Sequence, residues 1–370
     1  MLSLVSKPAI DIAQLVGRRE QFAYEQHLAR STYAYGVDLR RSAWLDRSTV
    51  GDPLMRSVDR RWNGLITNLS ADALLAPGTT LSAGVMDQLL GLVRLLHAPW
   101  PSVRVLQPAV AERWPIVAPL GTTKGGSHWL IIDKGRLEAL PESERTFLLA
   151  SGIAHLQCDH GPLYAAHLMA HRSGRGEGLI RTLLRPWSKV SVFSADRAGL
   201  IAVDELDLAR DALRAHADPA VPWLPPIPDV GERLRAVEEF SKSRLLTRLR
   251  LSGPQEGWSL APRLAKVEAA PEGDSEEAEK EKADDAEAAN EAPKDDAPKA
   301  EDAPPPSVSD PVEEAEAEGE KLAAEQAAAD EAREAAEDAV ANAKAREQAL
   351  AQAWPLARCD QRLTQRLGLL

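Results

Sequence analysis

Residues 268–310 constrain the fold most, because they contain almost no side chain that could join a hydrophobic core. The stretch consists mainly of Ala, Glu, Asp, Lys and Pro, and burial within such a composition cannot offset the entropy of an ordered chain. We therefore expect an acidic, disordered linker over residues 265–311. The folded body has to be built from the residues before it, and we expect that body to close near Leu264.

The chain after this linker has two parts of different character. Over residues 312–353 the prolines vanish and Ala, Glu and Lys dominate, which favours a helix by propensity, although no leucine heptad is present. We expect a solvated helical spacer there. Residues 354–370 restore an apolar stripe flanked by arginines, which predicts a C-terminal segment that docks on the body.

The charges of the chain are separated along its length. Residues 268–347 hold 28 Asp and Glu against 8 Lys and Arg, so the acidic balance of the whole chain conceals a remainder of +8. Such asymmetry predicts a tail that contacts its own body or an anionic partner. Because the basic body contains no recognisable nucleic-acid-binding module, we predict a protein partner and no nucleic acid.

The predicted compartment is the cytoplasm. Cys158 and Cys359 are too few for a disulfide framework, which agrees with a reducing environment. The N-terminus lacks the basic and apolar regions of a secretory signal, and no run reaches the roughly 18 apolar residues that a membrane span needs. We therefore expect a soluble protein.

The body is predicted to be mostly helical, in the α+β class. Apolar residues at helical spacing over residues 9–30, 54–68 and 81–96, the last with Val85, Leu89, Leu92 and Leu96, predict a helical N-terminal part over residues 1–100. The domain over residues 101–264 begins with three short apolar runs, with a turn expected over residues 121–126 between the last two, and these predict a small antiparallel sheet. Its helices are expected at three places, namely from Pro141 to about His160, from Pro186 to about His216, and from Glu232 to Leu249.

Two segments of this domain resemble a known family. Residues 140–160 read Leu-Pro-Glu-Ser-Glu-Arg-Thr-Phe-Leu-Leu-Ala-Ser-Gly-Ile-Ala-His-Leu-Gln-Cys-Asp-His, and residues 188–200 read Ser-Lys-Val-Ser-Val-Phe-Ser-Ala-Asp-Arg-Ala-Gly-Leu. Together they resemble the CAAX prenyl protease and HtpX heat-shock protease family of zinc metallopeptidases, over roughly residues 101–250. That family carries H-E-x-x-H on one helix and S-R-x-x-E-x-x-A-D on a second. Four residues fall on the second motif: Ser188, Lys189, Ala195 and Asp196.

The resemblance implies a zinc site whose ligands have been replaced. In H-E-x-x-H the two histidines hold zinc, the glutamate activates the zinc-bound water, and a third ligand comes from the second helix. The first histidine of the motif falls on Ser151, the glutamate on Gly152, the second histidine on His155, and the downstream ligand on Val192. A lone imidazole binds zinc far more weakly than three ligands do, so we expect a pseudoenzyme without a zinc cofactor.

Asp196 matches the acid that follows the missing ligand, and we expect it to tie the two motif helices together by hydrogen bonds. That role is structural and needs no metal ion. Retention of Asp196 beside Val192 favours a scaffold that was kept while its chemistry was lost.

Other histidines leave an alternative open. His167 and His171 have the i, i+4 spacing of a metal-binding pair, but we expect them to face solvent because no acidic base lies between them. His155 is expected to be a core residue, and the neighbouring Cys158 a small buried one. The alternative is an active zinc metallopeptidase that uses His155, His160 and a carboxylate from elsewhere.

Overall fold

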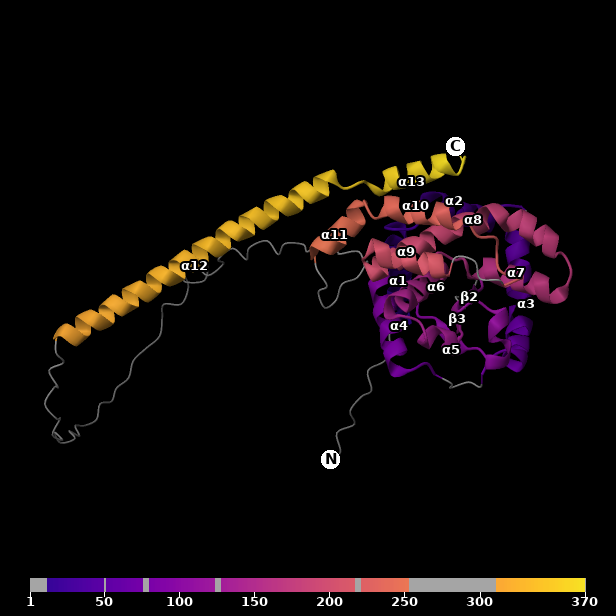
Figure 1. The fold of residues 1–370 in the computed structure, drawn as a ribbon. Coiled ribbons are helices and arrows are strands. Elements are labelled where there is room, and N and C mark those ends of the chain that lie inside the picture. Colours follow the sequence, from indigo (N-terminus) through magenta and orange to yellow (C-terminus); the bar gives the residue numbers. More distant parts are fainter. Residues whose placement is uncertain are drawn as a thin grey trace, which may run out of the picture. The chain divides into compact units, whose positions relative to one another are not determined.

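The computed structural model describes residues 12–49, 51–75, 80–123, 128–216, 221–252 and 311–369. Two compact units are present, Met1–Pro262 together with Gln348–Leu370, and Arg263–Glu347. The linker predicted over 265–311 lies, apart from its last residue, outside the described residues, as does much of the turn predicted around residues 121–126. Within the first unit, helices surround a small sheet (Figure 1).

The N-terminal part is helical, as the apolar spacing predicted. Its helices are α1 (Ile12–Ser31), α2 (Gly36–Arg47), α3 (Gly51–Asp72) and α4 (Ala83–Leu96). The sequence pattern predicted three of them and missed α2. Helices α3 and α4 each bury one face: the buried side chains of α4 include Val85, Leu89, Leu92 and Leu96, the apolar positions that predicted it.

The sheet has three strands and is mixed. Its strands are β1 (Ser102–Val105), β2 (Val117–Gly121) and β3 (His128–Ile132), with a 3₁₀ helix, η1 (Pro108–Arg113), between the first two. Strand β3 lies in the centre, antiparallel to β2 and parallel to β1. The prediction of an antiparallel sheet is therefore wrong for β1, because η1 carries the chain across so that β2 pairs on the far side of β3.

The central strand supplies side chains to two apolar cores. Leu130 and Ile132 belong to the core that includes α4 and α6, whereas Ile131 packs with residues of α3 and α7. This alternation follows from the two-residue period of a strand. The sheet thus lies between two layers of helix.

Seven further helices complete the body: α5 (Lys134–Glu138), α6 (Glu142–Gln157), α7 (Gly161–Ser173), α8 (Glu177–Val203), α9 (Leu206–Ala215), α10 (Val230–Phe240) and α11 (Arg244–Ser252). Helix α6 begins where the acidic first turn predicted, and its second half is buried almost all round. It lies against α8 and the sheet. This helix carries the motif positions.

Two predicted helices differ from the structure. The one expected over Pro186 to His216 begins earlier, at Glu177, and Pro186 lies inside α8 rather than at its start. Helix α8 ends at Val203, where Asp204 adopts a left-handed conformation with φ of 58°. The helix expected over Pro186 to His216 is therefore divided into α8 and α9, and the one expected over Glu232 to Leu249 is divided into α10 and α11. Buried contacts override the proline signal in α8, since Leu184 and Trp187 on either side of Pro186 are both in the core.

The C-terminal elements are two helices. Helix α12 (Pro311–Gln352) spans the predicted spacer, and its described side chains from residue 326 to residue 348 are exposed. Helix α13 (Leu356–Arg366) packs on the body: Asp360 forms an ion pair with Arg197 at 2.8 Å, and the Thr364 and Tyr35 hydroxyls are 2.7 Å apart. None of the described helices combines the length and apolar character that crossing a membrane requires.

Candidate functional site

The four motif positions lie together. Ser151, Gly152 and His155 of α6 and Val192 of α8 all line one pocket, with a volume of about 250 Å³. Its wall also includes strand β2 and the segment before it, the end of α9, and the side chains of Leu224, Pro225, Ile227 and Arg233. Residues forty positions apart therefore share a cavity, as they would if the two helices carried a ligand set.

His155 has both ring nitrogens engaged in hydrogen bonds. Its Nδ1 lies 2.9 Å from Nδ1 of His160, and its Nε2 lies 3.1 Å from the Tyr164 hydroxyl. A neutral imidazole carries one ring proton, and the contacts of His160 place it. Because His160 donates its Nε2 proton to the Asp38 carboxylate, its Nδ1 accepts, so His155 carries its proton on Nδ1 and accepts from Tyr164 at Nε2. His155 then donates to His160.

A hydrogen-bond relay runs from Tyr164 through His155 and His160 to Asp38 of α2. His160 Nε2 lies 3.0 Å from Asp38 Oδ1, Trp187 Nε1 donates to the same oxygen at 3.2 Å, and the Ser194 hydroxyl donates to Oδ2. A carboxylate accepts only, so His160 donates through Nε2 and is free to accept from His155 at Nδ1. Tyr164, His155, His160 and Asp38 thus form one directional chain from the pocket into the core.

Burial sets the protonation states of this chain. The pKa of His155 is held well below its usual range, mainly by burial and further by His160 and Arg233, so its imidazole is neutral. Burial also raises the pKa of Tyr164, whose hydroxyl keeps its proton. Both states agree with the hydrogen-bond directions, and the relay is complete without an added ion.

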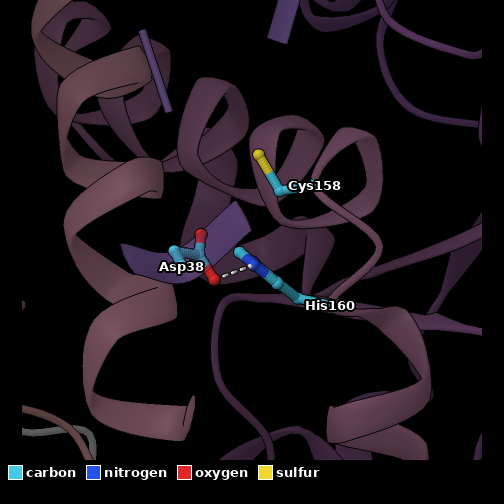
Figure 2. A group of neighbouring side chains, drawn as sticks. All are labelled: Asp38, Cys158 and His160. Atoms are coloured by element: carbon cyan, nitrogen blue, oxygen red, sulfur yellow. Dashed lines mark hydrogen bonds and ion pairs between the residues drawn. The ribbon is translucent and has the colours of Figure 1, made fainter. Parts of the chain in front are cut away.

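Asp38, Cys158 and His160 are the one group of possible metal ligands that the described residues bring together, with ligand atoms within 4.8 Å of one another. Figure 2 draws them: the dashed line joins Asp38 to His160, and none reaches Cys158. Burial raises the pKa of the Cys158 thiol, whereas a metal requires the thiolate. Both oxygens of Asp38 already accept from protein donors, so hydrogen bonding accounts for the group.

His167 and His171 do not form the solvent-facing pair that their spacing predicted. His167 is 2% exposed, whereas His171 is partly exposed and lies 3.4 Å from Glu177. Helix α7 starts directly after α6 and packs on β2, α3 and α8, which buries the face that carries His167. The structure gives Nε2 of His167 no hydrogen-bond partner among the described residues.

We expect His167 to make the fold sensitive to acid. Burial lowers its pKa from 6.5 to about 4. Between these two pH values the unfolded chain binds a proton that the folded chain does not. The stability from the neutral imidazole is complete above pH 6.5 and is lost as the pH falls through about 4. Since one pKa unit is about 1.4 kcal/mol, the loss is roughly 3 kcal/mol.

Urea unfolding of the wild type and of His167→Leu at pH 7 and pH 4.5, followed by circular dichroism, measures this effect. The variant should lose less of its free energy of unfolding between the two pH values. His27→Leu is the matched control, because it removes an exposed helical histidine in place of a buried one. Equal acid sensitivity of His167→Leu and the wild type would contradict the assignment.

Asp196 joins different helices from those predicted. Its carboxylate accepts from Nε and Nη2 of Arg233 at 2.9 and 2.7 Å, which ties α8 to α10 and not to α6. Ser151 links the two motif helices instead, since its hydroxyl donates to the carbonyl of Ala195 at 3.2 Å.

Three polar residues of the site were not predicted from the sequence: Asp38, Tyr164 and Arg233. Tyr164 lies four residues after His160, so the i, i+4 rule could have placed the two side chains on one face of a helix. No local signal connects Arg233 to Asp196, 37 residues earlier in the chain.

Comparison of the chain with protein-family models, with curated proteins and with solved structures finds no match. The resemblance to the zinc metallopeptidases therefore rests on the motif positions, and the location of all four in one pocket is the structural observation that bears on it.

Proposed function

We propose that this chain is a catalytically inactive metallopeptidase-like protein that acts as an interaction or regulatory module. The observation that carries the proposal is the pocket: the four motif positions line it, yet of these four only His155 offers a strong zinc donor. Gly152 and Val192 have no donor atoms, and Ser151 offers only a hydroxyl. Catalytic zinc normally has three protein ligands and an open position, so the residues present do not fit the ion.

The absent glutamate is the second support. A metallopeptidase needs a positioned base beside the water that it activates. At that position stands Gly152, and no Asp or Glu is among the described residues that line the pocket. His155 is a poor substitute because its Nε2 accepts from Tyr164.

An active zinc metallopeptidase with displaced ligands is the alternative. It would use His155 and His160, but their Nδ1 atoms face each other at 2.9 Å and the Nε2 atom of His160 faces Asp38. A metal ion would have to break this chain. The proposal of an inactive protein therefore has the stronger support.

Elemental analysis of the purified full chain tests the proposal. We expect no stoichiometric zinc after dialysis against zinc and then buffer, and no dependence of trace zinc on His155→Ala. Stoichiometric zinc that is lost in His155→Ala would overturn the proposal.

The double variant Ser151→His/Val192→Glu tests the resemblance itself. With His155 it offers three donors around the pocket, so it should bind about one zinc per chain without gaining a catalytic base at Gly152. Ser151→His alone, with two donors, is the matched control and should bind zinc more weakly. Failure of a folded double variant to bind zinc would remove the argument from motif positions.

The partner is proposed to be a protein, and the location is proposed to be the cytoplasm. A contact between the acidic segment and the basic body also stays a prediction, since it rests on charge alone and most of that segment lies outside the described residues.

A further inference from the structure

The pocket beside His155 is lined by cationic and apolar residues. Its described ionisable lining consists of Arg136, His155, Tyr164, His216 and Arg233, with no Asp or Glu among them. A pocket built for a hard cation such as Ca²⁺ or Mg²⁺ would show carboxylates. The lining of this one is complementary to an anion.

The acidic partners of these cations lie behind the lining. Arg233 binds Asp196, and His216 Nε2 lies 2.8 Å from Glu144, yet neither acid lines the pocket. The guanidinium of Arg233 and the imidazole of His216 therefore face the cavity, and the acids do not. Such oriented pairs favour negative charge at the site without placing an unpaired cation in the core.

Arg233 is the donor best placed for a ligand. Its Nε and Nη2 atoms hold Asp196, which fixes the guanidinium plane, and the structure records no partner for Nη1 among the described residues. Its side chain is 11% exposed and lines the pocket. A charge-assisted hydrogen bond in such a partly desolvated place is stronger than one in water.

Apart from Ser151, the rest of the described wall is apolar. It contains Ile116, Val117, Phe147, Leu148, Val192, Leu224, Pro225 and Ile227. The volume of about 250 Å³ suits a compact ligand rather than a large one. A ligand that fills it needs an anionic group for Arg233 and an apolar group for these side chains.

We propose that the pocket binds small carboxylic acids with an apolar body, the carboxylate on Arg233 Nη1 and the apolar group against Phe147 and Val192. This inference deepens the proposed function, on which it rests, by naming the ligand class of the pocket.

Isothermal titration calorimetry of the full chain with 3-phenylpropionate tests the ligand class. The uncharged 3-phenylpropionamide has nearly the same shape, and the acid should bind at least about tenfold more tightly, as a charge-assisted hydrogen bond implies. The blocked peptide acetyl-Ala-Glu-Ala-amide carries a carboxylate without the apolar body and should bind more weakly than the acid.

A charge series at Ala215 places the ligand in this pocket. Ala215 is exposed and lines the pocket at the end of α9, so substitutions there leave the core intact. Relative to Ala215→Gln, which adds a side chain of similar size without charge, Ala215→Glu should weaken acid binding about two- to threefold and Ala215→Lys should strengthen it by a similar factor. Binding of the amide should not change across the series.

Arg233→Lys keeps the charge but loses the fixed guanidinium, and it should weaken acid binding at least about tenfold. Any of four results would overturn the ligand class: equal affinity for the acid and the amide, no acid binding at 10 mM, preference for the peptide, or no response to the Ala215 series. Zinc analysis separates failure of the ligand class from failure of the proposed function. Protein that contains no zinc and does not bind the acid contradicts the ligand class alone.

Discussion

Replacing Gly152 with Glu is expected to destabilise the folded chain by at least about 2 kcal/mol rather than to restore a catalytic base. A Cβ atom at Gly152 would lie 2.5 Å from Cγ1 of Val117 and 3.1 Å from Cδ1 of Leu130. Valine is stiff about χ1, so its methyl group cannot move aside freely. The gain in helix propensity over glycine, about 1 kcal/mol at most, does not offset this overlap.

Urea unfolding of Gly152→Ala, Gly152→Glu and the double variant Gly152→Ala/Val117→Ala measures the overlap. Gly152→Ala should destabilise the chain, and combining it with Val117→Ala should cost less than the sum of the two single changes. Gly91→Ala is the matched control: Gly91 is an exposed helical position where a Cβ meets nothing within 4 Å. If Gly152→Ala stabilised the chain as Gly91→Ala should, the packing argument would be wrong.

This packing changes the meaning of the glycine in the motif. From the sequence, Gly152 is only a helix-weakening residue at the place of a lost glutamate. In the structure, strand β2 fills the space that a side chain would need, which lets α6 approach the sheet closely. The same glycine therefore removes the catalytic base of the motif and allows α6 to pack closely on the sheet.

Elements with one apolar face could be predicted from the sequence. Helices α3 and α4 each bury a stripe at helical spacing, and the acidic first turn marked the start of α6. The strands were also found as short apolar runs. Their pairing was not, because a local pattern marks a strand but not its neighbour, and β1 pairs with β3 across two intervening elements.

Helix α2 and its site residue were missed for the same physical reason. The inward face of α2 carries Asp38 and Ser42 beside Val37 and Leu45, and all four are buried. A search for apolar periodicity passes over a helix whose buried face is partly polar. Asp38 therefore has no signal in the sequence, although it ends the relay that begins at Tyr164.

Asp38→Ala is expected to lower the free energy of unfolding by about 3 to 5 kcal/mol. The substitution leaves three buried donors without their acceptor: Nε2 of His160, Nε1 of Trp187 and the hydroxyl of Ser194. Each unsatisfied buried donor costs roughly 1–3 kcal/mol. Asp38→Asn keeps an acceptor for His160 and Trp187, so it should cost less than half as much.

Urea unfolding at pH 7 measures the free energy of unfolding of Asp38→Ala and Asp38→Asn, and Asp207→Ala is the matched control. Asp207 also lies in the first turn of a helix, but it is exposed and forms a surface ion pair with Arg210, so its loss should cost no more than about 0.5 kcal/mol. A small effect of Asp38→Ala would mean that His160 does not depend on the carboxylate. The hydrogen-bond directions assigned to His155 and Tyr164 would then fail as well, because the proton position on His160 fixes both.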